Sequence, residues 1–225
     1  MVSQSLTNQT ALSQTYDNLK AGTYTVKITD ANGCPKTTVE KTLTQPAAAL
    51  SMTETLSSHN GFNITCNNAK NGSIDVTVSG GTAAYTYAWT TTDGTGLDAA
   101  AEDQTGLGPG TYSLTVTDSK NCPITKDFII TEPPVLNISE VISSHNGFNI
   151  TCSNVKDGAI DVTVTGGTSV YTYAWTTADG SGWDATAEDQ TGLGPGTYLL
   201  NVTDSNSCSI ATQTYVITEP PALTI

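Results

Sequence analysis

The sequence predicts an all-β protein made of β-sandwich domains in tandem, arranged as beads on a string. SSHNGFNITC occurs at 57–66 and again at 143–152, a period of 86 residues, and AEDQTGLGPGTY recurs with the same period. Within each copy, short segments alternate apolar and polar residues, as half-buried strands do. A period this long exceeds the roughly 20–50 residues of solenoid repeats, so each copy is expected to have its own core.

The repeat predicts the domain limits. Full repeats are expected at 47–133 and 134–220, the C-terminal part of a truncated repeat at 1–46, and the start of a further repeat at 221–225. Thr-Glu-Pro-Pro closes each full repeat, and its two prolines favour a stiff, extended link. The chain begins inside a repeat, so the lack of a signal segment after Met1 is not expected to bear on the compartment.

The alternating segments predict the core. Each full repeat should bury one face of three strands, in the first copy Ile74, Val76, Val78, then Tyr85, Tyr87, Trp89, then Tyr112, Leu114, Val116, and in the second copy Ile160, Val162, Val164, then Tyr171, Tyr173, Trp175, then Tyr198, Leu200, Val202. No segment has helical periodicity; residues 98–103 allow one short turn at most.

Short strands, glycine-rich turns, a central tryptophan and paired cysteines indicate an immunoglobulin-like sandwich. The stretch 107–112, Leu-Gly-Pro-Gly-Thr-Tyr, fits a tyrosine corner, in which the Tyr112 hydroxyl bonds back to the backbone. In antibody domains the second cysteine follows that tyrosine by two residues and lies within the strand. Here Cys122 follows by ten residues and lies in a turn. A disulfide is therefore expected to pin one end of the sandwich and not to cross its core.

The cysteines recur once per repeat as a pair. Cys66 and Cys122 are 56 residues apart, as are Cys152 and Cys208. This pattern predicts one intradomain disulfide per repeat, worth about 4 kcal/mol, and an oxidising compartment. A zinc site is the competing interpretation, but two ligands per domain without a CxxC pair give it little support. Cys34 occupies the second-cysteine position of the truncated repeat, and its partner is expected before residue 1.

The charge and the histidines exclude several functions. A formal net charge of −13 argues against binding nucleic acid or an anionic membrane surface, and no run of about 20 apolar residues predicts a membrane span. The only histidines, His59 and His145, occupy one repeat position and form no catalytic set. The protein is expected not to be an enzyme.

One loop in each repeat suggests a ligand. Four carboxylates recur there and provide oxygen ligands of the kind calcium prefers, namely Asp93, Asp98, Glu102, Asp103 and their counterparts Asp179, Asp184, Glu188, Asp189. The alternative is a solvated loop in which aspartates serve as turn residues. In the same loop Leu97 of the first copy becomes Trp183, which either stacks on a sugar ring or covers the end of a domain.

The motifs taken together resemble a known family. In order they are Ile-Thr-Cys, Gly-Ser-Ile-Asp-Val-Thr-Val-Ser-Gly-Gly, Tyr-Thr-Tyr-Ala-Trp, Leu-Gly-Pro-Gly-Thr-Tyr, Val-Thr-Asp-x-x-x-Cys and Thr-Glu-Pro. This order resembles the SprB-type repeat of Bacteroidetes surface proteins, whereas single motifs are shared with other bacterial Ig-like and PKD-like domains. The resemblance implies a very long extracellular adhesin, exported by type IX secretion and in some members driving gliding.

Two functions are therefore expected. The first is a non-catalytic, stiff spacer or filament in a cell-surface adhesin, whose partners are the neighbouring repeats. The second is an array of carbohydrate-binding modules in which weak sites for surface polysaccharide act by avidity.

Overall fold

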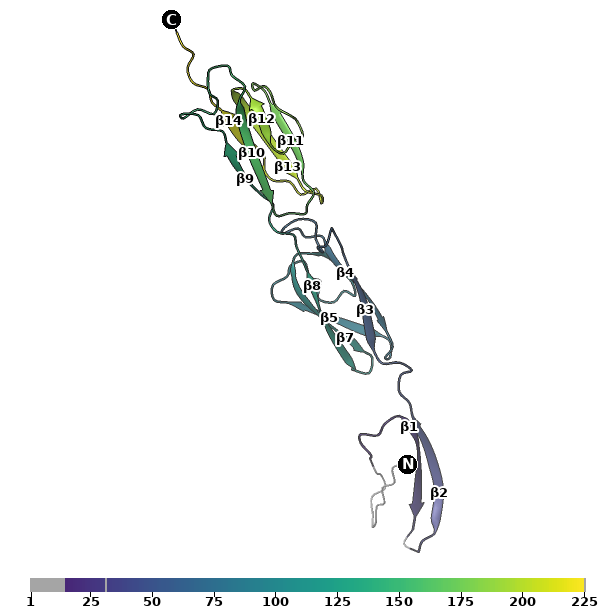
Figure 1. The fold of residues 1–225 in the computed structure, drawn as a ribbon. Coiled ribbons are helices and arrows are strands. Elements are labelled where there is room, and N and C mark those ends of the chain that lie inside the picture. The colour runs from purple at the N-terminus through teal and green to yellow at the C-terminus, as the bar shows by residue number, and fades with distance from the viewer. Residues whose placement is uncertain (1–14, 31, 225) are drawn as a thin grey trace. The chain divides into compact units, whose positions relative to one another are not determined.

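The computed structural model describes residues 15–30 and 32–224, and every regular element in these ranges is a β-strand (Figure 1). The predictions for Met1, for residues 1–14 and 31 of the 1–46 segment, and for the last residue of 221–225 lie outside the described residues. The chain divides into two compact units, Met1–Ala49 and Leu50–Ile225. In the first unit, β1 (Gly22–Thr29) pairs antiparallel with β2 (Pro35–Leu43).

The second unit contains two sandwiches, each made of two three-stranded antiparallel sheets. The first sandwich has sheets β3-β4-β6 and β5-β7-β8, with β3 Ser51–Leu56, β4 Gly72–Ser79, β5 Tyr85–Thr91, β6 Gln104–Leu107, β7 Gly110–Asp118 and β8 Pro123–Ile130. The second sandwich repeats this order as β9-β10-β12 and β11-β13-β14, with β9 Asn137–Ile142, β10 Gly158–Thr165, β11 Thr172–Thr177, β12 Gln190–Leu193, β13 Gly196–Thr203 and β14 Gln213–Ile217. The predicted all-β fold of tandem sandwiches is confirmed.

Each sandwich has its own core between its two sheets. In the first, Ile74 of β4 and Leu114 of β7 are fully buried, and Trp89 of β5 packs at 5.4 Å from the Phe128 ring. The second core has the same plan, with Trp175 against Tyr215 at 5.6 Å. The predicted inward faces are therefore correct. The domain limits at 133 and 220 stay a prediction, since the structure defines separate cores and not these boundaries.

The tyrosine corner is present in both sandwiches. The Tyr112 hydroxyl lies 2.9 Å from the Gly108 carbonyl oxygen, four residues back, and also bonds the backbone of Thr95. Tyr198 makes the equivalent bonds in the second sandwich. Gly96 lies in this region at φ +85°, and a Cβ there would collide with the carbonyl oxygen of Gly106, so the loop needs a glycine.

No helix in the described part of the chain is long and apolar enough to cross a membrane.

Candidate functional site

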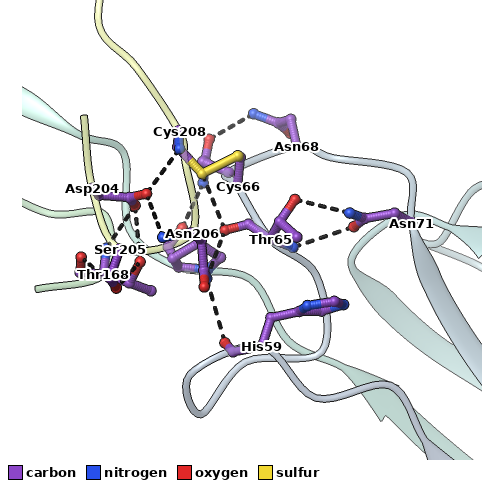
Figure 2. Close-up of a disulfide and its surroundings, with 12 residues drawn as sticks. His59, Thr65, Cys66, Asn68, Asn71, Thr168, Asp204, Ser205, Asn206 and Cys208 are labelled. Carbon is purple, nitrogen blue, oxygen red and sulfur yellow. Dashed lines mark hydrogen bonds between the residues drawn. A yellow bond between two sulfur atoms is a disulfide. The ribbon is translucent and has the colours of Figure 1, made fainter. Parts of the chain in front are cut away.

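The feature that most distinguishes this protein from a plain string of sandwiches is the junction between the first and second sandwiches. A disulfide joins Cys66 of the first to Cys208 of the second, across a sequence separation of 142 residues (Figure 2). Cys66 lies in the loop between β3 and β4, residues 57–71, which we call the receiving loop. Cys208 lies in the turn between β13 and β14, residues 204–208, which we call the docking turn.

The predicted intradomain pairing is therefore wrong. Cys122 and Cys152 are free and exposed, as is Cys34. The reason is the length of the sandwich. The receiving loop is tied to the C-terminal end of β8, because the Asn63 amide donates to the Thr131 carbonyl. Cys122 precedes the other end of this eight-residue strand, about 25 Å away. Disulfide geometry requires Cα atoms within about 7 Å, so these two cysteines cannot meet.

Hydrogen bonds from one side chain reinforce the disulfide. The side-chain amide of Asn206 donates to the Thr65 carbonyl oxygen at 3.1 Å and to the His59 carbonyl oxygen at 3.5 Å. The side-chain oxygen of Asn206 accepts from the side-chain amide of Asn60 at 2.6 Å. Asn60 also lies 3.2 Å from the Ser205 hydroxyl. The receiving loop thus bonds the docking turn through the carbonyl acceptors of His59 and Thr65 (Figure 2) and through the side-chain donor of Asn60.

The link between the sandwiches is held as well. The backbone amide of Asn68 donates to the Glu132 carboxylate at 2.6 Å, and the side-chain amide of Asn67 donates to the Pro133 carbonyl oxygen at 3.1 Å. On the other side, the Gly167 amide of the second sandwich donates to the Pro134 carbonyl at 2.8 Å. Three consecutive link residues are thereby fixed to one sandwich or the other, which restricts bending beyond what the two prolines impose.

The Asp204 carboxylate holds the docking turn through hydrogen bonds to its backbone. One carboxylate oxygen accepts from the amides of Asn206 and Cys208 at 2.9 and 2.8 Å, and the other accepts from the Thr168 amide at 2.9 Å. Burial alone would raise the pKa of Asp204, but the amide donors outweigh it and the pKa is lowered. The ionised carboxylate therefore stabilises the turn that presents Cys208.

This depressed pKa predicts acid sensitivity. The stabilisation is complete above the ordinary aspartate value of 3.8 and is lost as the pH falls through the lower pKa of the folded state. Asp204→Asn is expected to cost about 1–3 kcal/mol at pH 7, because amides lose a charged acceptor. The difference in the free energy of unfolding between this variant and the wild type should shrink near pH 2. Urea unfolding at both values measures this, with exposed Asp161→Asn as control; an equal difference at both would contradict it.

The acidic loops do not gather their carboxylates. In the first sandwich each serves a separate backbone or side-chain donor: Asp93 accepts from the Thr111 amide, Asp98 from the Ala100 amide, Asp103 from the Val76 amide, and Glu102 bonds the Tyr87 hydroxyl. Burial, with Glu102 adding to it, raises the pKa of Tyr87 to about 12. Asp179, Asp184, Glu188 and Asp189 repeat these roles.

The calcium hypothesis therefore finds no support in these positions. Among the residues that the structure describes, no group of three or more His, Cys, Asp or Glu side chains could hold a metal ion. The hydrogen bonds favour the alternative, since aspartates that accept backbone amide hydrogens define turns and strand edges, and the calcium site stays a prediction. A buried glutamine, Gln104, completes the loop by bonding the backbone of Asp98 in both directions, a role that the sequence analysis missed.

The remaining predicted residues are placed as follows. Trp183 is 37% exposed, whereas its counterpart Leu97 packs against the first core. His59 and His145 each form an isolated backbone bridge, with Phe62 and Phe148. The histidine backbones thus shape the receiving loop of the first sandwich and its copy.

Comparison with known proteins is informative for the repeats. The family model of the SprB repeat matches residues 62–94 and 148–180. No curated protein matches the chain significantly. Among solved structures, it is similar to the C-terminal 282-residue fragment of intimin, crystallised in complex with the intimin-binding domain of the translocated intimin receptor (Tir). The identity is 19% and the TM-score 0.40, over 76% of this chain and 64% of that chain. One match falls in each sandwich, so both full repeats contain a segment that matches the SprB repeat, as the resemblance predicts.

Proposed function

We propose that this chain is a non-catalytic, extracellular repeat region of a bacterial cell-surface adhesin, in which the sandwiches act as a stiff spacer. The observation that carries the proposal is the junction, where Cys66 and Cys208 join the two sandwiches covalently. A flexible array needs only a linker, whereas this junction adds a disulfide, hydrogen bonds from the docking turn and an anchored link.

The disulfide and the net charge of the chain also support this proposal. A disulfide between domains persists in an oxidising compartment, which favours the cell exterior over the cytosol. The net charge of −13 makes neighbouring copies repel each other, which favours single extended filaments over bundles. Export by type IX secretion and a part in gliding remain predictions from the family resemblance.

Nitrogen-15 relaxation of the full chain tests stiffness directly. The two sandwiches of the oxidised protein are expected to share one rotational correlation time, because the junction makes them tumble together. Cys66→Ser should lower the correlation time of both sandwiches, since only hydrogen bonds and the link then remain. The matched control is Cys122→Ser, which removes a free, exposed cysteine. Separate correlation times in the oxidised wild type would overturn the spacer proposal.

One observation favours the second function. Trp183 exposes 37% of its surface in a loop, and exposed aromatic rings are common contacts for sugars. We expect Trp183→Ala to abolish any saturable binding of the chain to bacterial or plant polysaccharides, measured by calorimetry. The control is Val216→Ala, which removes another exposed apolar side chain of the same sandwich. Absence of binding by the wild type leaves the spacer as the function of this region.

A further inference from the structure

We propose that residues 143–157 form a second receiving loop, and that it binds the docking turn of a further copy of the second sandwich joined in tandem. Cys152 then forms a disulfide with the counterpart of Cys208 in that copy. The first cysteine of each repeat would pair with the second cysteine of the next repeat, so that a covalent bridge closes every junction. This pairing rule goes beyond the spacer function, which requires only that junctions be stiff.

The second receiving loop already has the conformation of the bonded one. Residues 143–152 are identical to 57–66. The His59 amide bonds the Phe62 carbonyl at 2.7 Å, and the His145 amide bonds the Phe148 carbonyl at 2.6 Å. The positive φ angles also agree, 48° at Asn60 and 51° at Asn146. The loop thus adopts this shape without a docked partner, and little ordering cost would oppose binding.

The acceptor that contacts Asn206 is also prepared in the second loop. In the first loop, the backbone around Thr65 is held by the Asn71 side chain, which bonds both the Thr65 amide and its hydroxyl. In the second loop, Asp157 takes this role and accepts from the amide and the hydroxyl of Thr151. The hydroxyl hydrogen bond holds the pKa of Asp157 below its ordinary value. The Thr151 carbonyl is therefore positioned as the Thr65 carbonyl is.

The docking turn is a standard part of every hairpin of this type. In each one an aspartate accepts from the amide of the cysteine four residues later, at 2.8 Å for Asp30 and Cys34, 2.9 Å for Asp118 and Cys122, and 2.8 Å for Asp204 and Cys208. A further copy of the second sandwich would carry Asn206 as well. The three hydrogen-bonding groups that Asn206 meets, on residues 59, 60 and 65, recur on residues 145, 146 and 151.

The chain leaves the second sandwich beside its receiving loop, as it leaves the first. The Glu132 carboxylate accepts from the Asn68 amide at 2.6 Å, and the Glu219 carboxylate accepts from the Asn154 amide at 2.6 Å. Both are followed by two prolines. A sandwich joined after Pro220 would start from the same anchored position as the second sandwich does after Pro133.

The bond requires an oxidant. The thiolate of Cys152 attacks a small-molecule disulfide such as oxidised glutathione, which releases one glutathione thiolate and leaves a mixed disulfide. The thiolate of the incoming cysteine then displaces the second glutathione. Two cysteine thiols are oxidised to a disulfide and one glutathione disulfide is reduced to two thiols. The two protons that the cysteine thiols lose are taken up by the two released glutathione thiolates, so no proton is gained or lost overall.

The test extends the full chain after Pro220 with a second copy of residues 134–220. The five cysteines become seven. After refolding with glutathione, the sample is alkylated without reductant and analysed by peptide mass spectrometry. We expect a peptide pair joining Cys152 to the appended counterpart of Cys208, and three alkylated cysteines, as in the unextended chain. Cys152→Ser should leave that counterpart alkylated, and Asn146→Ala should reduce the yield of the bridge severalfold.

The Cys66–Cys208 peptide pair in the same sample separates the possible failures. If that pair is present and Cys152 is alkylated or joined to Cys208 of its own sandwich, the pairing rule is overturned while the spacer function stands. If the Cys66–Cys208 pair is also absent, the junction on which both ideas depend is itself rejected.

Discussion

When pulled from its two ends until both sandwiches have unfolded, the oxidised chain is expected to extend about 500 Å less than the reduced chain. The disulfide spans a sequence separation of 142 residues, and an extended chain covers about 3.3–3.6 Å per residue. While the disulfide is intact, the load passes from Cys66 directly to Cys208, and the residues between them cannot extend. The disulfide therefore limits the end-to-end length of the protein even after both sandwiches have unfolded.

Optical tweezers measure this contour length with and without a reducing agent. Cys66→Ser should show the longer contour length in both conditions. Cys122→Ser should behave as the wild type does, because that cysteine is free. Equal contour lengths for the oxidised and reduced wild type would show that no bond crosses the junction.

Removal of the core tryptophan of one sandwich is expected to destabilise that sandwich alone. Trp175 is 2% exposed, packs against Tyr215, and donates from its indole nitrogen to the Ala187 carbonyl at 2.9 Å. Trp175→Ala should therefore cost about 3–5 kcal/mol through the lost apolar contacts and the cavity left behind. The corresponding fall in melting temperature is about 4–8 °C per kcal/mol for a domain of this size.

Calorimetry of the full chain resolves this effect, because the first sandwich has a separate core and its transition should stay in place. Val141→Ala is the control in the same sandwich, and its cost should stay within about 0.5 kcal/mol because that side chain is 71% exposed. A downward shift of both transitions by Trp175→Ala would mean that the two sandwiches fold as one unit.

Local pattern in the sequence determined most of each sandwich. Alternation of apolar and polar residues placed Ile74, Leu114 and Trp89 on the inward faces, because a strand turns successive side chains to opposite sides. The Gly-Thr-Tyr stretch fixed the tyrosine corner, whose hydrogen bond spans only four residues. Features of this kind depend on neighbours in the chain, so the sequence is sufficient to find them.

The acidic loop shows where local pattern is ambiguous. Four recurring carboxylates are compatible with a cation site or with a set of turns, since both use carboxylate oxygens as acceptors. In the structure Asp93 and Asp103 accept from different backbone amides, those of Thr111 and Val76, which favours the turns. The pattern could not decide this, because it gives the type of each side chain and not the direction in which it points.

The disulfide was decided by tertiary structure alone. A cysteine pair that recurs every 86 residues fits pairing within a repeat, over 56 residues, as well as pairing between successive repeats, over 142. The sequence determined that a pair of cysteines recurs in each full repeat, that Cys122 lies in a turn, and that the fold is a tandem of sandwiches. Only the structure placed the receiving loop and the turn that carries Cys122 at opposite ends of the first sandwich. Because a disulfide requires close Cα atoms, that placement excludes Cys122 as the partner of Cys66, which is bonded to Cys208 of the second sandwich.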